Sequence, residues 1–175
     1  MTAAQAAGSE YRLSGYFDEA FSSDGEVRPA YRDLLDELSR NELAAIQGGV
    51  QSRLREAGVC FGPAGMRSDF VVDPVPRVIT SAEWAELSAG LGQRVRALQM
   101  FLADIYSRQE ILSAGVMRRS ILDGAPHFEP VAAGFGSPVV ADVAGPDLVR
   151  DQDGFRVLED NLRFPSGLTF ALAAR

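Results

Sequence analysis

Lysine is absent from this chain of 175 residues, and all 17 basic residues are arginines. The chain also has only one cysteine, one histidine and one tryptophan. The lone cysteine, Cys60, cannot form an internal disulfide, and we expect a cytoplasmic protein. A zinc site has little support, because zinc is held by several Cys or His residues together. We therefore expect Cys60 to be a packing residue and the single histidine, His127, to be exposed on a loop.

Positive charge is in deficit, with 24 acidic against 17 basic residues and a net charge of −7. This balance argues against nucleic acid and against an anionic membrane surface as partners. No run of about 18 apolar residues is present, so no membrane span is predicted. The first residues lack the basic and apolar regions of a secretory signal. The length fits one domain or a large part of one.

The strongest local pattern lies in residues 147–169, which read DLVRDQDGFRVLEDNLRFPSGLT. Apolar runs stand on both sides of Asp153-Gly154, a dipeptide favoured in hairpin turns because both residues tolerate positive φ. We expect two strands joined at this dipeptide. A further strand is expected over residues 139–143, which lead into the hairpin.

The second strand of this hairpin ends in Glu159-Asp160-Asn161. Glu159 and Asn161 are two residues apart, so their side chains share one face of the sheet. Asp147, across the hairpin, can reach that face. Two carboxylates and one amide oxygen are hard ligands that suit Mg²⁺. The sequence therefore predicts a metal site formed by Asp147, Glu159 and Asn161.

This stretch also admits two other interpretations. A plain hairpin without any ligand stays open on the pattern alone. An EF-hand loop is the second, since residues 151–154 are similar to its centre. That register fails, because Val149 falls at the first ligand position and Asp160 falls where a bidentate Glu is required.

The hairpin resembles the metal-binding motif of ATP-grasp ligases, in which an Asp opens the hairpin and Glu-x-Asn closes it. The form LEDNLRFPSG, at residues 158–167, is similar to a narrower group, the circularly permuted ATP-grasp proteins. Upstream segments also resemble that group, namely YFDEAF, VRPAY, DPVPRVITSAEW and LGQRVRALQMFLADIY. The resemblance covers nearly the whole chain.

This resemblance implies an ATP-dependent ligase that joins a small-molecule or peptide carboxylate to an amine through an acyl phosphate. Its cofactors would be ATP and Mg²⁺ or Mn²⁺. Arg163 and Arg77 would be catalytic groups that stabilise acyl-phosphate oxygens. Cofactor-binding roles are implied for Arg150, Ser166 and Gly167. For the three arginines, a surface salt bridge is the alternative interpretation.

Lysines beside a Gly-rich loop hold the ATP phosphates in ATP-grasp enzymes, and this chain has neither. Its Gly-rich spots at 62–65 and 134–136 fit neither GxGxxG nor the P-loop. Residues 1–15 are rich in Ala, Gly and Ser, and we expect a disordered tail there. Because the nucleotide-binding residues are missing, we expect residues 16–175 to be the N-terminal portion of a longer permuted domain, inactive until joined by a nucleotide-binding half as its partner. The alternative is a non-catalytic binding or regulatory module, or a truncated relic.

The predicted fold class is α/β of the α+β type, with a helical front half against a mixed or antiparallel sheet. Pro29 suits the first position of a helix. Thr80 and Glu83 have the spacing of a capping box, and a long helix follows with Leu98, Phe101, Leu102 and Ile105 as a core stripe. Trp84 is expected to be a core anchor of this helical region.

Overall fold

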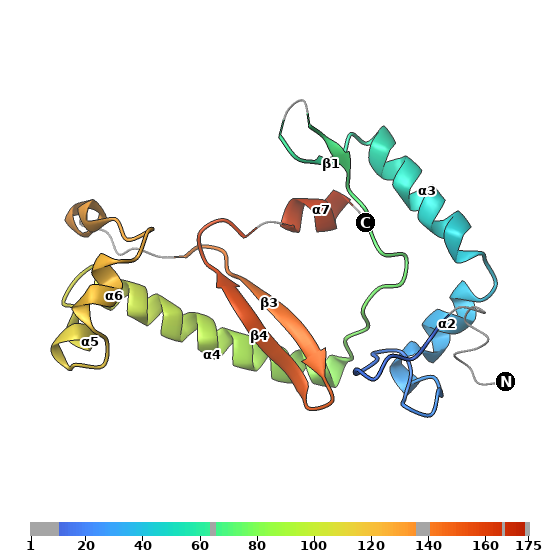
Figure 1. Ribbon diagram of the computed structural model, residues 1–175, viewed down its shortest axis with the longest axis horizontal. Coiled ribbons are helices and arrows are strands. Elements are labelled where there is room, and N and C mark those ends of the chain that lie inside the picture. Colours follow the sequence, from blue (N-terminus) through green and yellow to red (C-terminus); the bar gives the residue numbers. More distant parts are fainter. Residues whose placement is uncertain (1–10, 64–65, 136–140, 166, 174–175) are drawn as a thin grey trace. The chain divides into compact units, whose positions relative to one another are not determined.

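A computed structural model describes residues 11–63, 66–135, 141–165 and 167–173 of the chain (Figure 1). The chain divides into two compact units. Unit 1 comprises Met1–Trp84, Leu148–Val157 and Ser166–Arg175. Unit 2 comprises Ala85–Asp147 and Leu158–Pro165.

Unit 1 begins with helices and continues into a small antiparallel sheet. Its elements before the long helix are η1 (Pro29–Tyr31), α2 (Arg32–Leu38), α3 (Leu43–Glu56), β1 (Cys60–Phe61) and β2 (Ser68–Asp69). The strands β1 and β2 pair antiparallel, with Cys60 opposite Asp69. Cys60 is half-buried, as a packing residue would be.

Pro29 opens the first helical turn, as predicted. Tyr31 lies in the same turn and, together with Phe21 and Leu54, is one of three buried apolar residues in the described part of unit 1. The Tyr31 hydroxyl accepts a hydrogen bond of 2.9 Å from the Val78 backbone N–H. This bond fixes the Pro-rich segment against the helices of the same unit. The predicted disorder of residues 1–15 stays a prediction, and residues 1–10 lie outside the described residues.

The long helix α4 runs over Ser81–Ile105. Its start confirms the predicted capping box, because Glu83 Oε2 accepts bonds from the Thr80 N–H at 2.9 Å and the Thr80 hydroxyl at 2.8 Å. The prediction of Trp84 as a core anchor is wrong, since that residue is 57% exposed. Consecutive side chains on a helix point about 100° apart. Because Glu83 points towards Thr80, the next side chain, that of Trp84, points in a different direction and is exposed to solvent.

Unit 2 continues α4 into short helices. These are α5 (Glu110–Ser113), α6 (Arg119–Asp123) and η2 (Pro130–Phe135). Among the described residues of this unit, Ile105 and Leu122 are the buried apolar ones. The other members of the predicted core stripe, Leu98, Phe101 and Leu102, are only half-buried.

The predicted hairpin is present as β3 (Gly145–Asp151) and β4 (Gly154–Asn161), which form a second two-stranded sheet. Its turn lies at Gln152-Asp153, one residue before the predicted dipeptide. The Asp151 carboxylate causes this shift, because its Oδ1 accepts a 2.8 Å bond from the Asp153 N–H and starts the turn early. Gly154 still supplies the positive φ, at 117°.

The strand predicted over residues 139–143 is not found in its described part, since 141–143 belong to no strand and 139–140 lie outside the described residues. The side chain of Gln99 explains the difference. Its Nε2 donates to the Ala141 carbonyl at 2.6 Å, and its Oε1 accepts from the Ala141 N–H at 3.2 Å. Both backbone groups of Ala141 are therefore satisfied by a side chain, and β3 begins only at Gly145.

The last described element is α7 (Leu168–Ala173), which belongs to unit 1. Helices together with two small antiparallel sheets confirm the predicted α+β class. Among the described residues, no helix is long and apolar enough to cross a membrane.

Candidate metal centre

At the end of β4, the neighbouring acidic side chains of Glu159 and Asp160 lie on different faces of the strand. Asp160 is held by Arg94 of α4, whose Nε lies 2.8 Å from Oδ1 and whose Nη2 lies 2.6 Å from Oδ2. This hydrogen bonding keeps the pKa of Asp160 below its ordinary value. Because side chains alternate along a strand, Glu159 and Asn161 point to the face opposite Asp160.

Gly145, the first residue of β3, lies beside Asn161 at the end of β4. A Cβ atom built on Gly145 would be 3.8 Å from the Asn161 Cβ, so both residues address one face of the hairpin. Asp147 is two residues beyond Gly145 and shares its face. The approach of Gly145 to Asn161 therefore supports the predicted grouping of Asp147, Glu159 and Asn161 at the hairpin base, within unit 2.

The side chains of these three residues are free to bind a ligand. Asp147 and Glu159 are exposed, and Asn161 is half-buried. Within the described part of the chain, none of the three side chains makes a hydrogen bond or ion pair, whereas Asp151, Asp153 and Asp160 of the same hairpin are all paired with arginines. The three hairpin side chains without a partner are thus the three that the sequence predicts as metal ligands.

The donor chemistry of the set fits a hard divalent cation. Two carboxylates and an amide oxygen supply oxygen ligands only, and water or phosphate oxygens would complete a magnesium shell. The described residues contain no group of three or more His, Cys, Asp or Glu side chains that could hold a metal. The candidate set has only two acids, so it depends on the Asn161 amide for its third ligand.

Pro165 covers the same end of the hairpin. The Cβ built on Gly145 would lie 2.6 Å from the Pro165 Cβ, a distance that real Cβ atoms do not adopt. Glycine is therefore required at 145, because any side chain there would push away the segment that follows Asn161. The predicted anion-binding turn begins at this segment. Ser166 lies outside the described residues, and Gly167 has a φ of +97°, which suits a turn.

Arg163 follows the metal candidates and remains available to a ligand. It is exposed, and its guanidinium lies 5.4 Å from the Phe164 ring centroid. Its Nη1 lies 3.4 Å from His127 Nδ1. Within the described residues it has no carboxylate partner. His127 is exposed, as predicted.

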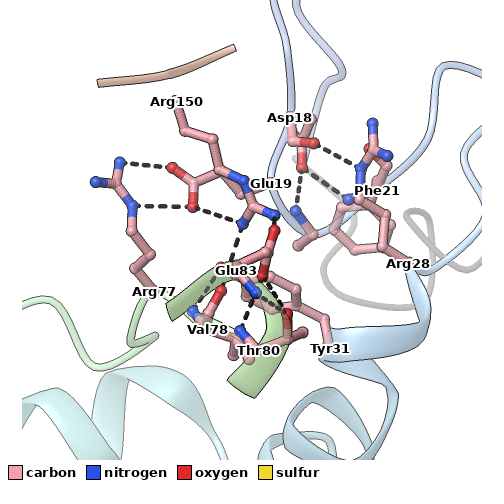
Figure 2. A network of polar contacts seen from close by, with 11 residues as sticks. Asp18, Glu19, Phe21, Arg28, Tyr31, Arg77, Val78, Thr80, Glu83 and Arg150 are labelled. Carbon is pink, nitrogen blue, oxygen red and sulfur yellow. Dashed lines mark hydrogen bonds and ion pairs between the residues drawn. The ribbon is translucent and has the colours of Figure 1, made fainter. Parts of the chain in front are cut away.

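Arg77 and Arg150 belong to unit 1, where both are bound to acidic side chains (Figure 2). Arg77 grips Glu19 with two nitrogens, at 2.5 Å and 2.9 Å. Arg150 contacts Glu83, and its Nη1 lies 3.7 Å from Glu19 Oε2, the oxygen that also accepts from Arg77 Nε.

The surroundings of Arg150 fix it further. Its Nη1 donates to the Val78 carbonyl at 3.4 Å, and its guanidinium lies 5.1 Å from the Phe155 ring centroid. Its side chain is only 14% exposed. These contacts match the salt-bridge interpretation of Arg150, and they join the hairpin tip to the start of α4 and to Glu19 within unit 1.

Sequence reasoning assigned no role to three residues that shape these sites. Arg94 orients Asp160, Gly145 admits Pro165, and Glu19 binds both arginines of unit 1. No local pattern identifies Arg94 or Glu19, since their partners are 66 and 58 residues away. Gly145 offered a signal, because a glycine at the start of a strand often marks a close backbone approach.

Known proteins resemble this chain over most of its length. The family described as circularly permuted ATP-grasp type 2 matches residues 76–175. A protein of Mycobacterium leprae is 42% identical over 165 residues, covering 91% of this chain and 29% of that protein. A Synechocystis protein is 38% identical and covers 94% of this chain and 36% of its own length.

A further relative comes from Frankia casuarinae and is provisionally named glutamate–cysteine ligase 2-2. It is 38% identical over 172 residues, which cover 94% of this chain and 20% of that protein. The chain thus spans between 20% and 36% of the lengths of these three relatives. Since the family match takes in more than half of its residues, the chain belongs to the circularly permuted ATP-grasp type 2 family.

Proposed function

We propose that this chain is the Mg²⁺-binding part of an ATP-dependent ligase that joins a carboxylate to an amine through an acyl phosphate. The observation that carries the proposal is the close approach of Gly145 and Asn161. It supports a common face for Asp147, Glu159 and Asn161, whose side chains have no other partner among the described residues.

The comparisons support the ligase class. ATP-grasp is the family of the chain. Two Frankia relatives carry provisional glutamate–cysteine ligase names, and such a reaction joins a carboxylate to an amine. The chain spans only 20% of each of these proteins, so the name describes the whole relative and reaches this chain as a proposal.

Each residue of the proposed site has a distinct task. Asp147, Glu159 and Asn161 would hold Mg²⁺ or Mn²⁺, which when bound neutralises the charge of the ATP phosphates. The guanidinium of Arg163 would donate hydrogen bonds to acyl-phosphate oxygens, a geometry that arginine matches with two donors. Arg77 could bind the acyl phosphate only after breaking its ion pair with Glu19. We assign Arg150 a structural role, because it pairs with Glu19 and Glu83 within unit 1.

The absence of lysine from this chain indicates what its partner must supply. The fixed positive charge that ATP phosphates need must come from groups other than lysines of this chain. We propose that the remaining part of the longer protein, or a separately encoded equivalent, supplies them. The chain alone is then expected to bind metal without turnover.

Metal binding is the first test, with Mn²⁺ as the probe and electron paramagnetic resonance as the readout. Asp147→Asn, Glu159→Gln and Asn161→Ala should each weaken Mn²⁺ binding by more than about tenfold, because even residues behind a ligand contribute factors of 10 to 100. Asp142→Asn is the matched control, since Asp142 is an exposed acid before β3. Equal binding by all four variants would reject the metal site.

Turnover is the second test. This chain is mixed with the remaining part of a longer relative, and ADP release is measured with candidate carboxylates and amines. Activity should require both parts and disappear in the Asp147→Asn, Glu159→Gln double variant. Mn²⁺ binding without any turnover in the mixture would instead favour a non-catalytic binding module.

A further inference from the structure

A pocket of about 310 Å³ lies in unit 2, at the end of α4. Its walls come from the last turn of α4, from α6 and from η2. Pockets for small molecules begin at about 300 Å³, so this one suits a ligand at the small end of that range. It is separate from the hairpin face that carries the metal candidates.

Gln109 on the pocket wall has an unusual backbone. Its φ of 54° is the only positive value of a non-glycine residue among the described residues. Such a conformation is strained in a residue with a side chain and persists only where the surroundings enforce it. The enforcing bonds are present, because the Gln109 N–H donates to the Asp104 carbonyl at 2.9 Å and its Nε2 donates to the Ile105 carbonyl at 3.1 Å.

The strained residue positions a cation on the same wall. Gln109 Oε1 accepts a 2.8 Å bond from Arg119 Nη1. Arg119 Nε in turn lies 3.2 Å from Asp123 Oδ1, and both side chains of this pair are about 60% exposed. Exposed ion pairs contribute little, so each charge can exchange its partner for a ligand at small cost.

Besides these charges, the pocket has apolar and aromatic lining residues. Ile105, Phe128 and Pro130 line it. The rings of Tyr106 and Phe128 lie 5.2 Å apart, and the Tyr106 hydroxyl accepts a 3.3 Å bond from the Glu129 N–H. A positive and a negative group beside an apolar wall are complementary to a small molecule with a carboxylate, an ammonium group and an apolar side chain.

We propose that this pocket binds an α-amino acid as a zwitterion, with its carboxylate on Arg119 and its ammonium group on Asp123. A zwitterion replaces one exposed ion pair by two charge-assisted contacts and leaves no charge unpaired. Its role as the amine substrate rests on the proposed ligase function, whereas the binding itself does not.

The location of the pocket fits that role. His127 lies between the lining residues Ala125 and Phe128, and its ring contacts Arg163, two residues beyond Asn161. The loop that forms the pocket wall therefore touches the segment that leaves the candidate metal centre. The pocket wall is thus linked to Arg163, the arginine assigned to the acyl phosphate, through His127.

The test is nuclear magnetic resonance on ¹⁵N-labelled chain, with L-alanine as the probe and without metal or ATP. L-alanine should shift the Gln109 amide and the Arg119 Nε signal, and acetate or methylammonium should bind about tenfold more weakly because each lacks one charge. Arg119→Gln and Asp123→Asn should each weaken L-alanine binding by about tenfold. Arg108→Gln is the matched control, since Arg108 forms an exposed pair with Glu110 outside the pocket.

Two results would overturn the proposal. One is the absence of shifts at Gln109 and Arg119, and the other is acetate binding as tightly as L-alanine. Melting temperatures of both pocket variants are measured, so that unfolding is not mistaken for lost binding. Mn²⁺ titrations of the same samples separate the two proposals. Lost Mn²⁺ binding with intact L-alanine binding would reject the metal site alone.

Discussion

Arg94 and Asp160 form a two-pronged ion pair between α4 and the end of β4, with nitrogen–oxygen distances of 2.6–3.0 Å. Asp160 stands between Glu159 and Asn161 in the sequence. By holding the middle residue on one face, Arg94 leaves its two neighbours on the other. The ion pair therefore decides which of three consecutive polar side chains are available to a metal.

This ion pair predicts a specific dependence of stability on pH. Arg94 holds the pKa of Asp160 below its ordinary value, so the pair stabilises the fold above an unfolded-state pKa of about 3.9 and this stability is lost as pH falls through the folded pKa. Asp160→Asn should therefore lower the urea midpoint at neutral pH, and the difference from wild type should vanish in acid. Asp142→Asn, an exposed acid without this partner, should show no such pH-dependent difference. A deficit of Asp160→Asn that persists at low pH would contradict the linkage.

Gly145→Ala should destabilise the protein by about 1–3 kcal/mol, because the new methyl group would overlap Pro165. Chemical denaturation measures the loss. Gly134→Ala is the matched control, since a Cβ there has nothing within 4 Å. Mn²⁺ binding should weaken in Gly145→Ala as the segment after Asn161 shifts. Equal stability of the two variants would mean that Pro165 does not approach Gly145.

Arg150→Ala should destabilise the protein by about 2–4 kcal/mol, because it leaves Glu83 and Glu19 without their shared cation in a half-buried place. Arg156→Ala provides the comparison on the same hairpin. Arg156 pairs with Asp151 and Asp153 but is 57% exposed, so its loss should change stability little. Thermal unfolding of both variants distinguishes them. Unchanged stability of the Arg150→Ala variant would contradict this structural role and leave Arg150 as a candidate ligand-binding residue.

Thr80→Ala should cost about 1 kcal/mol by removing the cap of α4. Loss of helical circular dichroism on heating reports this change. Ser88→Ala, within the same helix and exposed, should be neutral by comparison. The opposite ranking would show that the helix is held by its packing and not by its first turn.

Local patterns in the sequence determined several features of this protein. The capping box at Thr80 and Glu83, the first helical turn at Pro29 and the presence of the hairpin all depend on residues within a few positions of one another. Such short-range interactions leave a readable pattern. The position of the turn differed by one residue because a single side-chain bond, from the Asp153 N–H to Asp151, decided it.

The candidate metal residues also come from the sequence, through the Glu-x-Asn spacing and the family resemblance. Whether these side chains are free to bind a metal cannot be read from the sequence. It depends on Arg94 claiming Asp160, and on Gly145 lying beside Asn161. Arginines likewise look alike in the sequence, yet Arg163 is free of acids among the described residues while Arg77 is bound to Glu19. Contacts between residues far apart along the chain have no local pattern, because they arise only when folding brings distant segments together.

Sequence patterns alone thus identified the family, the capped start of α4, and the residue types of the candidate site. The tertiary structure alone decided which charges are paired, where Ala141 is held by Gln99, and that Gln109 and Arg119 share a pocket wall. The physical reason is the range of the interactions. Propensity, capping and alternation act over a few residues, whereas ion pairing and pocket formation depend on the folded path of the whole unit.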